Sequence, residues 1–314
     1  MSFASRIKEE VVRQRVKEPE QKLSQLSGLT FACGSLQLGR KMGLLYRTEN
    51  GEVAKHIASL ASSLYKSLEI LVEKAEQQHR KTPLYTVNLQ GEGLRSLLLG
   101  TGVMAEDADG ALSLQDGIPL SLISNEEGQR AFVRGCFLGC GTCTDPRGEY
   151  HLELVCPTEF FAKGLLSLLE GFGLQCAVTL RRNRFVVYLK GGDDITGFLA
   201  LIGSSGAALD LENVRAEKET RNYVNRTTNC EYANLDKLVA ASVKQQRAVE
   251  IILRFGHFDK LPAALREAAE LRLNYPDASL QELADMADIR KSGMNHRLQR
   301  IIEYAEDLES GLRQ

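Results

Sequence analysis

Apolar residues recur along the chain with the two periods that distinguish helices from strands. After residue 50 the apolar positions Val53, Ile57, Leu60 and Leu64 fall three or four residues apart, which predicts a helix with one buried face. Short apolar runs such as YTVNL at 85–89 predict strands. The same pattern predicts further helices near 20–33, 126–140 and 157–171, helix starts near 91 and 193, and strands near 35–40, 43–48, 67–74, 84–89, 149–155, 173–180 and 184–190.

Two pairs of matching segments indicate an internal duplication. Residues 26–34 (LSGLTFACG) match residues 133–141 (VRGCFLGCG), and residues 85–91 (YTVNLQG) match residues 185–191 (FVVYLKG) in the same order. Each copy has the predicted element order αββαββα, with sheets that are apolar on one face and polar on the other. The prediction is an N-terminal helix over 1–18 and a repeat domain over 19–205, with copies at about 19–105 and 126–205.

Gly28 and Gly135 occupy matching positions within the first predicted helix of each copy. A glycine inside a helix costs about 1 kcal/mol relative to alanine. It is favoured where two helix backbones pack more closely than a Cβ atom allows. We therefore expect these two helices to pack against each other across a pseudo-twofold axis. The alternative is that both glycines are unrelated and merely tolerated.

The last third of the chain has a different, helical pattern. Residues 206–234 are predicted to be a linker, because the segment begins with small and polar residues. Residues 235–314 are predicted to be an all-α domain. One face of its first helix is formed by Leu235, Leu238, Val239, Ser242, Gln246, Val249 and Leu253. Ser279 and Glu282 form a capping-box pattern at the start of a short helix. Ser292 is expected to cap the next helix.

The two final helices predict a helix-turn-helix motif at about 277–309. Met294, Leu298, Ile301, Ala305 and Leu308 form the apolar stripe of the second helix. The candidate DNA-binding residues at its start are Arg290, Lys291, Ser292, Asn295, His296, Arg297, Gln299 and Arg300. Arg221, Asn225 and Arg226 are further candidates, although such residues can equally cap helices and close turns. The alternative for the motif is a helical hairpin with a solvated basic face.

Composition narrows the setting of the protein. The chain has 314 residues, 43% of them hydrophobic, and a net charge of −2, so any nucleic-acid surface must be a local patch. The charged N-terminus has no apolar core of the kind found in secretory signals, and the seven cysteines are odd in number. We therefore expect a cytoplasmic protein with reduced cysteines and no membrane association.

The motif LSGLTFACG resembles the LAGLIDADG motif of homing endonucleases, and residues 133–141 resemble a more diverged copy. In that family the acid at the eighth motif position binds the divalent metal that cleaves DNA. Here these positions hold Cys33 and Cys140, and a thiol is a poor ligand for Mg²⁺. We therefore expect a scaffold without catalytic residues, metal or cofactor, which is not an enzyme. The cysteines at 136, 140, 143 and 156 are interpreted as packing residues, with zinc binding and redox sensing as alternatives.

The two halves together resemble the WhiA family of bacterial regulators. The resemblance rests on MSFASRIKEE, RGCFLGCGTCTDPRGEYHLEL, RNYVNRTTNCEYANLDK and SLQELADMADIRKSGMNHRLQRI, and covers essentially the whole chain. It implies an α+β fold: a duplicated αββαββα LAGLIDADG-like domain followed by an all-α helix-turn-helix domain.

In function, the resemblance implies a double-stranded DNA-binding protein of the nucleoid, needed for cell division and chromosome segregation, and for sporulation in mycelial relatives. A transcriptional regulator that acts with RNA polymerase or another transcription factor fits this description. The alternative is an interaction scaffold of cell division whose DNA binding is incidental.

Overall fold

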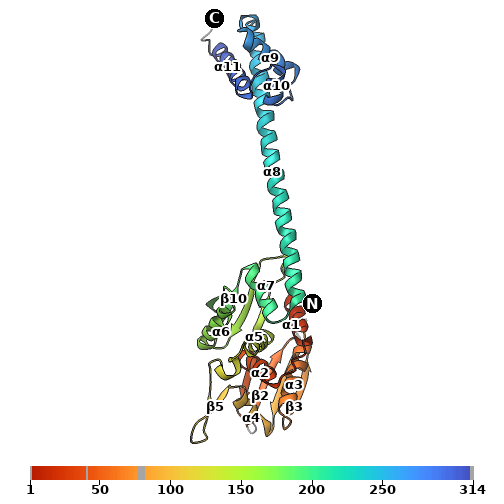
Figure 1. The fold of residues 1–314 in the computed structure, drawn as a ribbon, viewed down its shortest axis with the longest axis vertical. Coiled ribbons are helices and arrows are strands. Elements are labelled where there is room, and N and C mark those ends of the chain that lie inside the picture. Colours follow the sequence, from red (N-terminus) through yellow and green to blue (C-terminus); the bar gives the residue numbers. More distant parts are fainter. Residues whose placement is uncertain (1, 40–41, 77–81, 312–314) are drawn as a thin grey trace. The chain divides into compact units, whose positions relative to one another are not determined.

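A computed structural model describes residues 2–39, 42–76 and 82–311 of the chain. These residues form two compact units, which divide between Lys218 and Glu219. One long helix, α8 (Ser205–Arg254), contributes its first turns to the first unit and its remainder to the second (Figure 1).

The first unit contains two copies of one arrangement. The first copy consists of α2 (Pro19–Cys33), β1 (Gly34–Gln37), β2 (Gly43–Thr48), α3 (Gly51–Leu64), β3 (Glu69–Ala75), β4 (Leu84–Gln90) and α4 (Gly93–Gly100). The second consists of α5 (Glu126–Cys140), β7 (Gly141–Cys143), β8 (Leu152–Cys156), α6 (Glu159–Gly171), β9 (Ala177–Arg181), β10 (Arg184–Leu189) and α7 (Gly192–Leu201). The antiparallel sheets have the matching orders β1-β2-β4-β3 and β7-β8-β10-β9. The predicted fold class and duplication are confirmed.

Four short elements of the first unit, three of them between the two copies, have no counterpart among the predicted ranges. The helix α1 (Phe3–Arg13) was expected at the N-terminus, but the hairpin β5 (Met104–Glu106) and β6 (Leu112–Leu114) and the 3₁₀ turn η1 (Leu120–Ile123) between the copies were not. The strand β7 was also missed. Segments of three or four residues are too short for hydrophobic periodicity to identify them.

The helices α2 and α5 cross at the glycines, as the sequence predicts. A Cβ atom on Gly28 would lie 2.2 Å from the carbonyl oxygen of Phe132, and one on Gly135 would lie 2.1 Å from that of Gln25. Both distances are far below van der Waals contact, so only glycine permits this approach. The rings of Phe31 and Phe132, 6.4 Å apart between centroids, pack beside the crossing.

The predicted linker at 206–234 is helical throughout, because residues from elsewhere in the chain stabilise its start. The carboxylate of Glu10 in α1 accepts hydrogen bonds from the Ser204 hydroxyl and the Gly206 and Ala207 amides. Leu211 is buried in the core of the first unit. The segment has linker-like composition, yet this distant carboxylate caps the helix and complements its dipole.

The second unit is all helical. After α8 come η2 (Phe258–Lys260), α9 (Ala263–Asn274), α10 (Leu280–Met286) and α11 (Lys291–Glu309). The predicted apolar face of α8 is wrong in part, since Leu235 is 55% and Val239 50% exposed. Ser242 and Val249, which the prediction also placed on this face, are buried, and Gln245 and Ile252 pack beside them. Burial of Ser242 is possible because its hydroxyl donates a hydrogen bond to the Pro276 carbonyl.

We expect Gly135→Ala to destabilise the first unit by roughly 1–3 kcal/mol, because the added methyl group must push α5 away from the backbone of α2. Gly171→Ala is the matched control, since a Cβ atom at Gly171 meets nothing within 4 Å. Urea unfolding followed by circular dichroism measures both. Equal stability of the two variants would contradict the role of the helix crossing.

Candidate nucleic-acid interface

The helix α10 is fixed at both ends by local chemistry. The Ser279 hydroxyl accepts a hydrogen bond from the Glu282 amide at 3.3 Å, and the Glu282 carboxylate accepts one from the Ser279 amide at 2.7 Å. These bonds hold the pKa of Glu282 below its usual value. The predicted capping box is confirmed. At the other end Asp288 takes a left-handed backbone conformation with φ of 48°, which aspartate tolerates better than most residues.

The predicted cap at Ser292 is wrong, because α11 starts earlier. The carbonyl of Arg290 accepts a hydrogen bond from the Met294 amide at 3.1 Å, so Lys291 is already the first helical residue. Arg290 itself has the extended conformation of a cap, but its side chain makes no capping bond. Ser292 is therefore the second helical residue, and its side chain is exposed.

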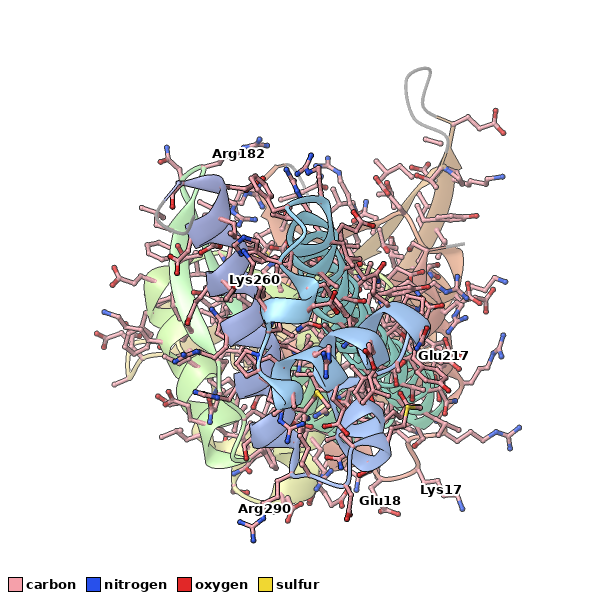
Figure 2. All side chains as sticks on the ribbon, turned by 90° about the horizontal axis from the view of Figure 1, so that it is seen from above. Lys17, Glu18, Arg182, Glu217, Lys260 and Arg290 are labelled. Carbon is pink, nitrogen blue, oxygen red and sulfur yellow. The ribbon has the colours of Figure 1, made fainter. Side chains whose placement is uncertain are left out.

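The apolar stripe of α11 is confirmed: Met294, Leu298, Ile301, Ala305 and Leu308 are all buried in the core of the second unit. At 100° per residue, the remaining polar residues of the first three turns form two adjacent columns. One column contains Lys291, Asn295 and Gln299, and the other contains Ser292, His296 and Arg300. All six side chains are exposed. Arg290, which precedes them, points away from the neighbouring helices (Figure 2).

Arg297 does not belong to this exposed surface. Its guanidinium donates to the Glu267 carboxylate at 2.8 Å and to the Ala264 carbonyl at 3.4 Å, both in α9. The side chain is only 23% exposed. Arg300 differs, since its nearest carboxylate is Glu303 at 4.0 Å and its side chain is 58% exposed. Of the two arginines predicted to contact DNA, the fold therefore uses Arg297 to join α11 to α9 and leaves Arg300 available.

Arg272 is a residue that sequence reasoning missed. Its side chain is buried, and one guanidinium nitrogen donates to the carbonyls of Tyr275, Pro276 and Ala278, at 3.4, 3.2 and 2.7 Å. Burial lowers its pKa. These bonds fix the turn between α9 and α10 and so position the motif. A charged residue near the end of a helix usually lies on the surface, so no signal in the sequence distinguishes this one.

Arg221, Asn225 and Arg226 lie on a stretch of α8 that is exposed on all sides in this structure. Arg221 and Asn225 are four residues apart and share one side of the helix, while Arg226 lies about 100° further round. The structure therefore shows that these three side chains are accessible. It does not bring them into one cluster with the exposed columns of α11.

The thiols that replace the endonuclease acids lie at the ends of the crossing helices. Cys33 is the last residue of α2 and Cys140 the last of α5. Each donates to the carbonyl four residues earlier, Leu29 at 3.3 Å and Cys136 at 3.2 Å. Burial raises the pKa of Cys33 to about 12 and also raises that of Cys140. Neutral thiols are unsuitable ligands for a divalent metal such as Mg²⁺, so the residues present do not fit the metal that the fold implies.

The other cysteines give no sign of a metal or redox site within the part of the chain that the structure describes. All seven cysteines are free, and Cys136, Cys143 and Cys156 are buried. In the same described ranges no three histidine, cysteine, aspartate or glutamate side chains lie close enough to hold a metal ion.

Comparisons with known proteins place the whole chain in one group. Residues 19–104 match the WhiA N-terminal LAGLIDADG-like domain, residues 129–221 the WhiA LAGLIDADG-like domain, and residues 224–305 the WhiA C-terminal HTH domain.

Relatives with this full arrangement are similar over their whole length. The "Probable cell division protein WhiA" of Clostridium perfringens (strain 13) is 39% identical over 315 residues, 99% of each chain. The protein of the same name from Clostridium beijerinckii is 40% identical over 314 residues, again 99% of each. The crystal structure of full-length DUF199/WhiA from "Thermatoga maritima" matches with a TM-score of 0.62 and 25% identity, over 98% of both chains. Among the described residues no helix is both long and apolar enough to cross a bilayer.

Arg297→Ala is expected to lower the unfolding free energy of the second unit by about 1 kcal/mol, because it removes the contacts of Arg297 with α9. Arg300→Ala is the matched control and should leave stability unchanged, since its ion pair is long and exposed. Thermal unfolding of the two variants measures the difference. If Arg300→Ala is the less stable protein, the structural role given to Arg297 is wrong.

Proposed function

The chain belongs to the WhiA family, and from that premise we propose that it binds specific sequences of double-stranded DNA as a transcriptional regulator in cell division and chromosome segregation. The observation that carries the proposal is the pair of exposed polar columns on α11. Their apolar opposite side is fully buried, so the helix is fixed with these side chains outward.

The chemistry of the two columns suits a DNA duplex. Asparagine and glutamine amides can donate to and accept from the edge of adenine, so Asn295 and Gln299 are proposed to read bases. Arg290, Lys291 and Arg300 carry exposed positive charge, and the ion pair of Arg300 with Glu303 is long at 4.0 Å, so all three are proposed to contact phosphates. Ser292 and His296 lie between these groups and supply neutral donors to bases or phosphates.

The exposed part of α8 provides a second proposed contact. Arg221 and Asn225 share one side of the helix, and Arg226 lies close by in sequence. An arginine-asparagine surface of this kind can contact phosphate and sugar oxygens. Such contacts would strengthen binding to all sequences and would not determine which sequence is bound.

We propose that the first unit is a catalytically inert scaffold. Its support is the pair of neutral thiols, Cys33 and Cys140, at the positions of the endonuclease acids. In the cell we propose that the protein acts in the cytoplasm on the nucleoid, together with RNA polymerase or another transcription factor.

A second candidate function, an interaction scaffold of cell division, is favoured by an apolar hollow on the first unit. This hollow, with a volume of about 540 Å³, is lined in part by Leu120 and Phe160, which are 78% and 63% exposed. Genome-wide DNA occupancy of the full chain and of a variant lacking residues 219–314 distinguishes the two functions. Loss of localised peaks together with impaired division favours the regulator. Normal division without those residues favours the scaffold.

DNA binding should respond differently to the two kinds of contact on α11. Asn295→Ala and Gln299→Ala are expected to cost roughly 1–3 kcal/mol on the specific duplex and to relax its specificity. Lys291→Ala and Arg300→Ala should weaken specific and scrambled duplexes alike and lower the salt slope by about 1. Titration at several salt concentrations measures both effects. Arg254→Ala, an exposed arginine outside α11, is the control. Parent-like binding by all four variants would exclude α11 as the reading helix.

Incubation of supercoiled plasmid with the pure protein and Mg²⁺ or Mn²⁺ should give no nicked or linear product. The reason is that neutral thiols hold no hard metal at the two acid positions. Gel analysis of the plasmid tests this. Cleavage that requires the metal and disappears in Cys33→Ala or Cys140→Ala would show that the scaffold is active after all.

A further inference from the structure

Lys8 of α1 lies where the crossing helices α2 and α5 end. One face of α1, with Phe3, Ile7 and Val11, is buried in the core of the first unit. Lys8 stands beside this face, and its Nζ atom is 5.9 Å from the ring centroid of Phe137, one helical turn before Cys140. Its charge interacts electrostatically with Cys140, Cys33 and Glu49. The amine therefore lies near both thiols, although it comes from a helix outside the duplication.

The ammonium of Lys8 lies over the Phe137 ring but has no hydrogen-bonded partner within the part of the chain that the structure describes. Among residues 2–39, 42–76 and 82–311 no hydrogen bond or ion pair joins it to another side chain, and desolvation lowers its pKa. Lys8 is half-buried, so its charge is partly removed from water, and such a charge is costly where the surroundings do not favour it. An apolar side chain such as leucine would avoid the cost of desolvating a charge. A lysine at this position therefore indicates negative charge around the amine that favours a cation.

The ends of the two crossing helices supply that preference. The last carbonyl groups of a helix point outward with roughly half a unit of negative charge. The two ends, Cys33 of α2 and Cys140 of α5, lie together, since a Cβ atom on Gly139 would be only 3.0 Å from the Sγ atom of Cys33. In the homing endonucleases that the motif resembles, carboxylates at these positions bind a divalent metal. In this chain Cys33 and Cys140 replace those carboxylates, and among the described residues no three histidine, cysteine, aspartate or glutamate side chains lie close enough to hold a metal ion.

We propose that the ammonium of Lys8 is the resident cation of this site and takes the place of the divalent metal. Two carboxylates and a divalent cation sum to zero charge, whereas two neutral thiols and one ammonium leave one positive charge, which the negative ends of α2 and α5 offset in part. Because the amine belongs to the chain, the site is filled in every molecule and needs no metal. The N-terminal helix α1 thereby closes the former metal site from within the fold.

Two other roles for this cluster fit the surroundings less well. An anion-binding site would place negative charge at the negative ends of two helices. A redox pair would need at least one reactive thiolate, whereas burial raises the pKa of both Cys33 and Cys140.

The test restores the acids with and without the amine, in the full-length protein. One variant carries Cys33→Asp and Cys140→Asp, a second adds Lys8→Met to these, and a control adds Lys66→Met, which removes an exposed lysine elsewhere. Mn²⁺ is the probe. Its binding is measured by isothermal titration calorimetry and by the rise in melting temperature at increasing Mn²⁺ concentration.

The proposal expects Mn²⁺ to bind and stabilise only the variant that lacks Lys8, while the diacid variant and the Lys66→Met control bind none. If the variant without Lys8 unfolds when metal is absent, refolding on addition of Mn²⁺ also supports the proposal. Equal Mn²⁺ binding by the diacid variant that keeps Lys8 would overturn it. Failure of the variant without Lys8 to bind or refold with Mn²⁺ would overturn it as well.

Discussion

The contact between α2 and α5 without intervening side chains is the constraint on which the first unit depends. At Gly28 and Gly135 each helix meets the backbone of the other, so the distance between their axes has no freedom to adjust. This distance brings two equivalent helix ends together, and the sheets of both copies extend from those ends, since β1 follows α2 and β7 follows α5 without a connecting loop. One substitution at the crossing would thus disturb both halves at once.

Local chemistry explains what the sequence predicted well. The bounds of α5, the capping box of Ser279 and Glu282 and the buried stripe of α11 all depend on residues within a few positions of one another. The features that the sequence did not indicate share the opposite property. The start of α8 depends on Glu10, about 195 residues away in the chain, and the orientation of Arg297 depends on Glu267 in another helix. No periodicity in the sequence records a partner of this kind.

Ser292 and Leu235 show how a correctly predicted helix can still be assigned the wrong cap or the wrong buried residue. Serine is a good helix cap, yet the Arg290 carbonyl already starts α11 two positions earlier. The apolar positions 235, 239 and 253 have helical spacing. The side of α8 that is buried, however, depends on its contacts with α9, α10 and α11, and Leu235 and Leu253 lie outside these contacts. A helix can therefore be predicted from the sequence alone. Which of its side chains are exposed can be decided only from its contacts with other helices.

The exposed stretch of α8 at the start of the second unit has a consequence for motion. From residue 219 to residue 241 every side chain is exposed or at most half-buried, so packing contributes little to the helical state there. An unsupported helix of this length is only marginally stable in water, and asparagine, which occurs at 222, 225, 229 and 234, lowers its propensity further. The backbone amides of this stretch should exchange with solvent much faster than those of the packed turns on either side. Local melting of this stretch would leave the packed turns of α8 and the core of the second unit intact.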